Sequence, residues 1–267
     1  MAYTTINKSS DYFNTKLYTG NGSNGHAITG VGFQPDFVWI KDRDTATNHM
    51  VTDAVRGATK TLHTQNTDVE STAVNALSSF NTDGFTVNTD TDLNANNKKN
   101  VAWNWKANGA GSANTEGSVS ATVSANTTAG FSIVQYNTAG SGTQTMGHGL
   151  DSAPTFIITK PTQNSESWYV YIPTGVSSSL RLNTTAAAVS STPYAGTPTD
   201  TLFSINNGVI GGYTGVISYC FTDVKGYSKF GSYTGNGNAD GPFVYTGFKP
   251  AFVMVKESSS TGSWCIF

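Results

Sequence analysis

Histidine, cysteine and serine are the residue types of this chain with the most versatile chemistry. The histidines show neither HxH nor HExxH spacing, and no two cysteines stand close enough to form a ligand pair. Zinc sites usually carry such spacings. No GxSxG segment singles out a nucleophilic serine. We therefore expect no metal site, no cofactor and no catalytic residue. The histidines and cysteines are His26, His49, His63, His148, Cys220 and Cys265.

Carboxylates are the next candidates, because glycoside cleavage needs a pair of them and calcium needs several oxygen ligands. The local acidic clusters are Asp42-Arg43-Asp44 and Asp90-Thr91-Asp92, and neither has EF-hand spacing. We interpret them as solvated loop acids rather than a calcium site. The carboxylates considered for cleavage are Asp42, Asp44, Glu70, Asp83, Asp90 and Asp92, a number that any β-rich chain of this length offers.

Aromatic side chains could bind sugars, since a glycan stacks on an aromatic face beside a few polar partners. Trp168, Tyr169 and Tyr171 lie within four positions of one another. If this run is a strand, Trp168 and Tyr171 face opposite sides of the sheet, because side chains alternate along a strand. We expect at least one of the three in the core, and an exposed one to contact a glycan or a partner subunit.

Short strands are the elements that would position these side chains. Residues 37–40, 155–158 and 252–255 are rich in β-branched and aromatic residues, and each run follows a proline that fixes φ at the strand entrance. Residues 101–105 and 131–136 alternate with period two, as half-buried strands do. These patterns predict an all-β protein.

Turns and helices support the same class. Clusters such as Gly20-Asn21-Gly22 and Asp83-Gly84 supply the positive φ of tight turns. The best helix candidate, residues 53–60, would make one or two turns at most. Short strands at regular spacing predict an antiparallel sandwich or jelly roll.

An internal repeat organises these strands. Residues 18–41 and 233–256 share the pattern Tyr-Thr-Gly-Asn-Gly followed by Gly-Phe-Xaa-Pro and a strand, at a constant offset of 215, and residues 136–160 carry a weaker copy. After each strand a second matching run follows, which aligns His49 with Trp168 and Trp264. The bulk of His49 is therefore expected to matter more than its ionisation.

The repeat predicts four regions. Residues 1–107 form the first sandwich, residues 108–129 a linker rich in Gly, Ser, Ala and Thr, residues 130–225 the second sandwich, and residues 226–267 the incomplete start of a third. A third unit that stops there would expose unpaired edges. We expect the sequence to be a fragment of a longer chain, or the third unit to be completed by another chain.

Composition limits the partners. A net charge of -2 with only 12% charged residues offers no cationic surface, so we expect no nucleic acid. The first residues lack the features of a signal peptide, and no run is apolar enough to insert into a membrane, so the chain is expected to be made in the cytoplasm. Cys220 and Cys265 lie in alternating runs, which favours small apolar fillers over a disulfide.

The pattern at residues 18–41, with Val55-Arg56-Gly57-Ala58 and residues 101–105, resembles a repeat module of marine bacteriophage virion proteins. Such proteins are tail-fibre, receptor-binding or other structural components, and their units resemble tandem concanavalin or laminin-G-like sandwiches. Residues 130–225 match loosely, because they lack a counterpart of the Asp-Xaa-Val-Arg-Gly segment at residues 53–57. The resemblance implies a virion location and no catalytic residue.

These observations favour a non-enzymatic virion component, such as a fibre, appendage or surface decoration. It would contact other virion subunits, form a homo-oligomer and bind host-surface glycans, with avidity supplied by repeated weak sites. The alternative is a carbohydrate-binding module of a bacterial surface or secreted protein. A polysaccharide depolymerase is a third class, and it would need a carboxylate pair in a groove.

Overall fold

Strands dominate the chain. The computed structural model describes residues 4–172 and 178–267. Their helices are two α-helices of four residues, α1 (Thr91–Asn94) and α2 (Asn207–Ile210), and the 3-10 helix η1 (Ser9–Asp11). Each of the strand pairs formed by these residues is antiparallel. The predicted all-β class is confirmed.

The first sandwich pairs a six-stranded sheet with a three-stranded sheet. The order β1-β9-β3-β4-β5-β6 makes the large sheet, and β2-β8-β7 makes the small one. The large sheet comprises β1 (Phe13–Thr19), β9 (Lys99–Trp105), β3 (Phe37–Asp42), β4 (Met50–Asp53), β5 (Lys60–His63) and β6 (Ser71–Thr72). The small sheet comprises β2 (His26–Thr29), β8 (Gly84–Val87) and β7 (Leu77–Asn81).

The second sandwich pairs a seven-stranded sheet with a two-stranded one, in the orders β10-β11-β12-β18-β14-β15-β16 and β13-β17. The large sheet comprises β10 (Ser112–Asn114), β11 (Ala121–Asn126), β12 (Phe131–Tyr136), β18 (Val216–Phe221), β14 (Phe156–Pro161), β15 (Tyr169–Tyr171) and β16 (Leu180–Arg181). The small sheet comprises β13 (Thr143–Gly147) and β17 (Leu202–Asn206). Its core is formed by both sheets, as in the first sandwich.

Residues 108–129, whose composition predicts a linker, contain β10 and β11. Strand β11 pairs with β12 from Thr122 opposite Gln135 to Asn126 opposite Phe131. Ala121 and Val123 are buried in the second core, while Thr122 between them is more exposed. The run is therefore an edge extension of the large sheet. Burial alternates over residues 121–123 as in a half-buried strand, and composition by itself does not reveal this alternation.

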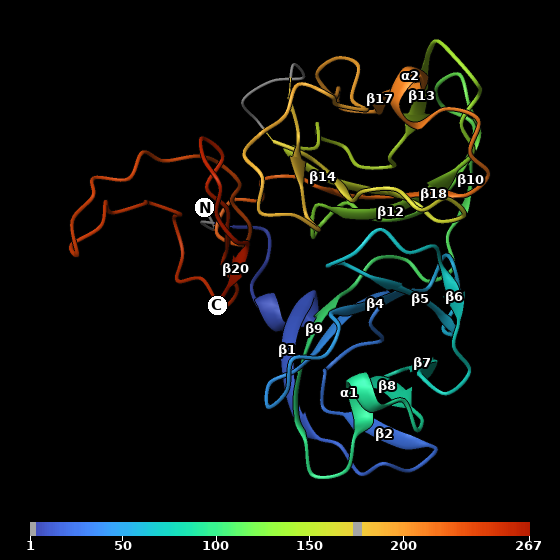
Figure 1. Ribbon diagram of the computed structural model, residues 1–267, viewed down its shortest axis with the longest axis vertical. Coiled ribbons are helices and arrows are strands. Elements are labelled where there is room, and N and C mark those ends of the chain that lie inside the picture. Colours follow the sequence, from blue (N-terminus) through green and yellow to red (C-terminus); the bar gives the residue numbers. More distant parts are fainter. Residues whose placement is uncertain (1–3, 173–177) are drawn as a thin grey trace.

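The C-terminal segment, residues 226–267, contains one two-stranded hairpin. Strands β19 (Met254–Val255) and β20 (Cys265–Ile266) pair with each other. Residues 229–253 precede them without strand structure, and Figure 1 shows much of this stretch looping away from the two sandwiches.

The four sheets are stacked in layers along the long axis, with the two large sheets adjacent in the middle (Figure 1). Strand β3 shows which residues allow a strand to lie between two such layers. Its residues Val38 and Ile40 enter the core of the first sandwich, whereas Phe37 and Trp39 enter a second core that also contains residues of β12, β14 and β18. Both faces of the strand are therefore buried, which explains its continuous apolar run.

Residues 53–60, the best helix candidate of the sequence, contain turns but no α-helix. The Asp53 carboxylate accepts hydrogen bonds from the backbone N–H groups of Val55 and Arg56 at 3.1 and 2.9 Å, and Gly57 has a φ of 106°. These bonds cap a single turn, and the positive φ of Gly57 ends it before a second turn can form. Residues 54–56 form a turn, and β5 starts at Lys60. Among the described residues, neither α-helix reaches the length needed to cross a bilayer.

Both cysteines are free, so no disulfide forms. Cys220 is a buried filler of the second core, and burial raises the pKa of its thiol. The filler interpretation is wrong for Cys265, which is exposed, because β20 is a two-residue edge strand with no second sheet over that face.

Candidate assembly interface

The three aromatic residues singled out by the sequence are all buried, with exposed fractions of 1% for Trp168 and 4% each for Tyr169 and Tyr171. Trp168 contributes to the core between the two large sheets, whereas Tyr169 and Tyr171 contribute to the core of the second sandwich. Trp168 and Tyr171 thus face opposite sides of the sheet. None of the three presents an open ring face on which a sugar could stack.

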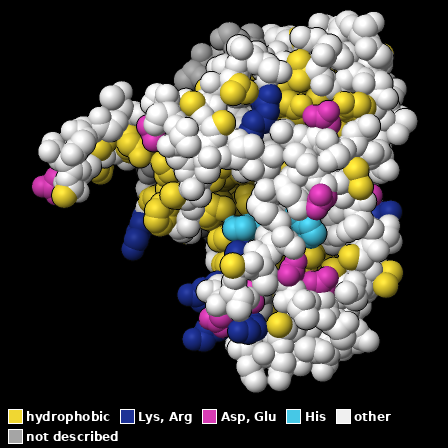
Figure 2. Space-filling model, viewed as in Figure 1, with side chains coloured by type: hydrophobic (Ala, Val, Ile, Leu, Met, Phe, Trp, Pro, Cys, Tyr) yellow, Lys and Arg dark blue, Asp and Glu magenta, His cyan; other side chains and the backbone are white. Residues whose placement is uncertain are grey.

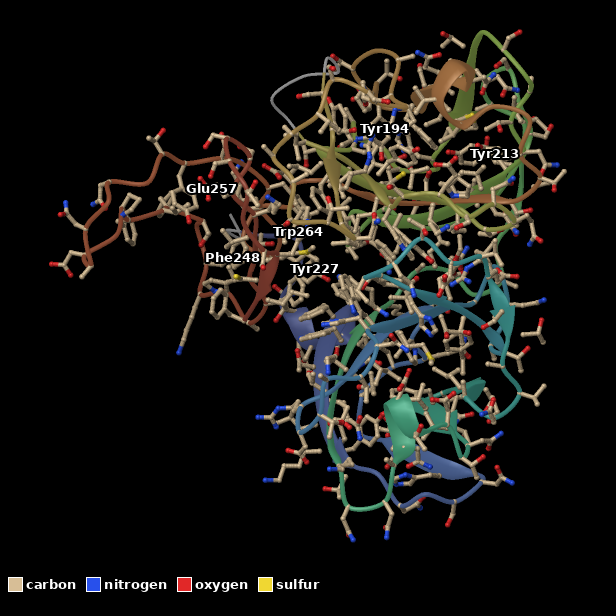
Figure 3. All side chains as sticks on the ribbon, in the orientation of Figure 1. Tyr194, Tyr213, Tyr227, Phe248, Glu257 and Trp264 are labelled. Atoms are coloured by element: carbon tan, nitrogen blue, oxygen red, sulfur yellow. The ribbon has the colours of Figure 1, made fainter. Side chains whose placement is uncertain are left out.

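Each of these rings has a structural partner. The Tyr169 hydroxyl donates to Glu166 at 3.1 Å, and the guanidinium carbon of Arg181 lies 4.1 Å from the centre of the Tyr169 ring. Burial, followed by the charge of Glu166, raises the pKa of Tyr169. The rings of Tyr171 and Tyr194 meet edge to face at 5.4 Å. In Figure 3 Tyr194 lies within the second sandwich.

A shared core joins the two large sheets. It is built from side chains of the first sandwich, of the second sandwich and, at its edge, of the C-terminal hairpin. Aromatic contacts cross it, with Phe37 at 4.4 Å from Tyr219 and 6.0 Å from Phe131 between ring centres. Its buried members are Phe37, Trp39, Val51, Leu62, Val101, Trp103, Ala107, Phe131, Ile133, Ile158, Trp168, Val170, Leu180, Leu182, Ile217 and Tyr219.

A buried ion-pair network crosses the same boundary. The Arg56 guanidinium bonds Asp53 at 2.5 Å and Glu70 at 3.2 Å, and its side chain is 1% exposed. Tyr219, from the second sandwich, donates to Asp53 at 2.7 Å and lies 3.3 Å from Arg56. Burial would lower the pKa of Arg56, but Asp53 and its other partners raise it. The Asp-Xaa-Val-Arg-Gly segment therefore joins the two sandwiches.

Two hydrogen bonds recur between successive parts of the chain. Trp168 Nε1 donates to the carbonyl of His63 in β5, and Trp264 Nε1 donates to the carbonyl of Arg181 in β16, both at 2.9 Å. The two acceptors hold corresponding positions. His63 lies opposite Met50 of β4, and Arg181 lies opposite Tyr169 of β15, the residue that aligns with Met50 in the repeat. The hairpin thus contacts the second sandwich as the second sandwich contacts the first.

A lysine makes the second recurring bond. Lys160 Nζ donates to the carbonyl of Thr67, four residues after His63, and Lys256 Nζ donates to the carbonyl of Thr185, four residues after Arg181, both at 3.3 Å. Burial lowers the pKa of Lys160 to about 8. The corresponding lysine of the first sandwich, Lys41, bonds carbonyls of its own loop instead.

A groove of about 1550 Å³ opens where the hairpin meets the two sandwiches. Figure 2 shows hydrophobic side chains gathered at this junction. Its walls include Phe13, Trp103 and Phe221 of the sandwiches and Phe252 and Trp264 of the C-terminal segment. Figure 3 places Trp264 beside the body of the molecule and Phe248 farther out from the sandwiches.

The charges lining this groove are cationic. Among the described lining residues the charged side chains are Lys41, Arg43, Lys229 and Lys249, together with the titratable His49, and none is Asp or Glu. His49 Nδ1 lies 3.1 Å from Trp39 Nε1, so it accepts a hydrogen bond. Burial, and then the charge of Lys41, lowers the pKa of His49 to about 4. The groove therefore lacks the carboxylate pair that glycoside cleavage requires.

The acidic clusters predicted to be solvated are turn caps. Asp42 is buried and accepts from the N–H of Asp44 at 2.6 Å and of Thr45 at 3.1 Å. Burial would raise the pKa of Asp42, but these hydrogen bonds hold it below its usual value. Asp90 caps α1 by accepting from the N–H of Asp92. The described residues hold no group of three or more His, Cys, Asp or Glu side chains arranged for a metal ion.

The interface residues that sequence reasoning did not assign to a site are Arg56, Tyr219, Phe252 and Trp264. A signal existed for two of them. Arg56 belongs to a segment that the repeat shows to be unequal between units, and Trp264 aligns with Trp168. The partner of Arg56 could not be found, because Tyr219 lies 163 positions away.

Comparison with known proteins gives one match. No curated protein and no solved structure matches the chain. A family model described as a domain of unknown function, DUF7483, matches residues 8–267. The match covers nearly the whole chain, including both sandwiches and the hairpin, and the protein therefore belongs to the DUF7483 family.

Proposed function

We propose that this protein is a non-enzymatic structural component of a virion, such as a fibre, appendage or surface decoration, that binds other subunits through the groove. The observation that carries the proposal is the groove itself, which combines apolar walls with a two-stranded sheet that pairs with no other strand of the described residues. An apolar recess of this size on a chain with few charges is typical of an interaction surface. The virion location rests on the resemblance of residues 18–41 to marine bacteriophage modules.

We further propose that the chain is a tandem array of concanavalin or laminin-G-like sandwiches. Support comes from strand order, since β1-β9-β3-β4-β5 of the first large sheet corresponds to β12-β18-β14-β15-β16 of the second. The register agrees too. Trp39 faces Val51 in the first sandwich, Ile158 faces Val170 in the second, and Met254 faces Ile266 in the hairpin. Repeated units with recurring contacts suit an assembly that displays many copies of a weak site.

A matched pair of surface variants tests the function. Leu17 lines the groove and is 57% exposed, whereas Val74 is 69% exposed and lies outside it. Either can become Ser without opening a core. We expect gold-labelled antibody and negative-stain microscopy to locate the protein on particles, and Leu17→Ser to reduce its incorporation several-fold while Val74→Ser leaves incorporation unchanged.

Other outcomes would point to the other functions. Binding of the isolated chain to a glycan array, with no label on particles, would favour a carbohydrate-binding module. Release of reducing ends from capsule or lipopolysaccharide would overturn the non-enzymatic assignment. Equal incorporation of the two variants would show that the groove is not the subunit contact.

A further inference from the structure

A third hydrogen bond recurs beside the tryptophan and lysine bonds that join successive parts of the chain. The backbone N–H of Glu70 donates to the carbonyl of Thr162 at 2.7 Å, and the N–H of Ala188 donates to the carbonyl of Ser258 at 2.9 Å. Here the earlier part of the chain is the donor, whereas the tryptophan and lysine bonds run from the later part to the earlier one. Each contact is therefore bonded in both directions.

The groups of the three bonds keep their spacing from one contact to the next. Those of the earlier part differ by 118 positions between the first and second sandwiches, and those of the later part differ by 96 between the second sandwich and the hairpin. The same positions are therefore used twice, although the first sandwich meets a seven-stranded sheet and the second a two-stranded hairpin. The corresponding groups are His63 and Arg181, Thr67 and Thr185, Glu70 and Ala188, Lys160 and Lys256, Thr162 and Ser258, and Trp168 and Trp264.

Lys160 is the costly member of this set. It is fully buried, and its ammonium donates to the carbonyls of Thr67, Pro161 and Asn164 at 3.3, 2.8 and 3.2 Å. No carboxylate of the described residues lies within 4 Å of this ammonium. An apolar side chain would fill the place without the cost of taking a charge out of water. A buried polar group of this kind can fix geometry at a cost in stability, as a single polar residue fixes register in a coiled coil.

The first sandwich does not use the donor half of the contact. At the lysine position, Lys41 donates to the carbonyls of Asp42 and Thr45 in its own loop. At the tryptophan position, His49 replaces the indole and accepts a hydrogen bond from Trp39. The first sandwich therefore takes part only as the earlier partner, whereas the second sandwich takes part as the later partner in one contact and the earlier partner in the next.

We propose that each sandwich carries a docking site made of these backbone groups, and that its partner is a repeat with a lysine and a tryptophan eight positions apart, whose orientation the site sets. The inference rests on the proposed tandem array, because it names how successive units bind one another. On the earlier unit the site consists of backbone groups alone, so the choice of partner lies with the two donor side chains of the later unit. Hydrogen bonds are directional, whereas the apolar core supplies free energy without direction.

Two backbone amides report the two contacts separately. The N–H of Glu70 lies in the contact between the sandwiches, and the N–H of Ala188 lies in the contact with the hairpin. Amide hydrogen exchange, read by NMR on the full chain, therefore measures the opening of each contact. We expect Trp168→Phe, which removes the indole donor, to speed exchange at Glu70 about tenfold or more and to leave Ala188 unchanged. Trp264→Phe should have the reverse effect.

A tryptophan of the first sandwich is the matched control. Trp39 is buried in the same shared core, and its indole donates to His49 at 3.1 Å within one sandwich. Its replacement by phenylalanine therefore removes the same donor from the same core without touching either contact. We expect Trp39→Phe to speed exchange at Glu70 and Ala188 no more than at the other amides of the core strands.

Lysine variants repeat the test if a tryptophan variant does not fold. Lys160→Met should speed exchange at Glu70, and Lys256→Met should speed exchange at Ala188. Three results would overturn the inference: an equal change at both amides, no change at either, or the same selective pattern in the control. The readout uses purified protein without particles. Failure here, with label still found on particles, would therefore remove the docking site but leave the proposed virion role standing.

Discussion

At the scale of single residues, the ion pairs of Arg56 are the most buried among the described residues. Asp53 and Arg56 are almost fully buried, and Glu70 is 9% exposed. Taking charges out of water is costly, and the cost is offset only while each partner is present. The stability of the contact between the two sandwiches therefore depends on the placement of these charged partners as well as on the apolar area buried there.

Replacing Arg56 by Met should destabilise the protein by about 3–5 kcal/mol, because Asp53 and Glu70 would be left buried without their partner. The free energy of unfolding in urea measures this. The control is Arg43→Met, since Arg43 is exposed and forms no ion pair within 4 Å among the described residues. A loss below about 1 kcal/mol for the Arg56 variant would contradict the network's role.

His49 should make stability depend on pH. The pKa of His49 falls from 6.5 to about 4 on folding, so the unfolded chain binds a proton that the folded chain does not between these values. Stability contributed by the neutral ring is complete above about pH 6.5 and decreases as pH falls toward 4. The His49→Gln variant keeps an acceptor for Trp39. Between pH 7.5 and pH 4.5, we expect the free energy of unfolding of the unsubstituted protein to fall by on the order of 2 kcal/mol more than that of the variant.

The measurement for His49 is urea unfolding of both proteins at both pH values. Carboxylates contribute to each protein alike, so the difference between the two slopes isolates the ring. Identical slopes would show that His49 is not held neutral by burial.

At the scale of elements, strands form where their partners are present. The hairpin β19–β20 forms because both of its strands lie within the chain, whereas residues 229–234 stay unpaired. The predicted strand at residues 252–255 is accordingly reduced to Met254–Val255. A strand pattern in a sequence describes what a segment can pair with, and pairing needs a second segment.

The turn between β7 and β8 shows how closely one element can constrain another. Gly84 has a φ of 141°, and an added Cβ would lie 2.0 Å from the carbonyl oxygen of Ile28 in β2. We expect Gly84→Ala to lower the free energy of unfolding by about 3 kcal/mol or more, through both strain and the clash.

Gly25 is the matched control for Gly84, because its φ is 73° and a Cβ there meets nothing within 4 Å. Gly25→Ala should cost only the left-handed strain, about 1 kcal/mol. Thermal or urea unfolding of the two variants separates the terms. Equal losses would mean that the approach of Ile28 can relax freely.

At the scale of the whole molecule, we expect the shared core to make the two sandwiches unfold together. Its members come from both large sheets, so neither sandwich keeps that core when the other unfolds. We expect a single calorimetric transition in which the calorimetric and van't Hoff enthalpies agree.

A core variant sharpens this expectation. Phe131→Ala, in the second sandwich, should remove about 3–5 kcal/mol and lower the unfolding midpoint of both sandwiches together, because Phe131 contacts Phe37 and Trp105 of the first. Amide exchange read separately over the two sandwiches reports each midpoint. Two separate transitions, or a shift confined to the second sandwich, would refute the single unit.

Local pattern in the sequence determined the all-β class, the strands near residues 37, 156 and 254, and the opposite orientations of Trp168 and Tyr171. These follow from alternation and turn chemistry, which act between neighbours in the chain. The sequence also contained the offset of 215 that the register of the hairpin follows.

Only the tertiary structure decided which faces are buried. Trp168, Tyr169 and Tyr171 were candidates for an exposed site, and they are buried because the large sheets are covered on both sides. Residues 108–129 have the composition of a linker, yet they contain two strands. Arg56 forms a hydrogen bond with Tyr219, which belongs to the other sandwich. Burial and pairing across such distances depend on how sheets stack, and no local pattern specifies that stacking.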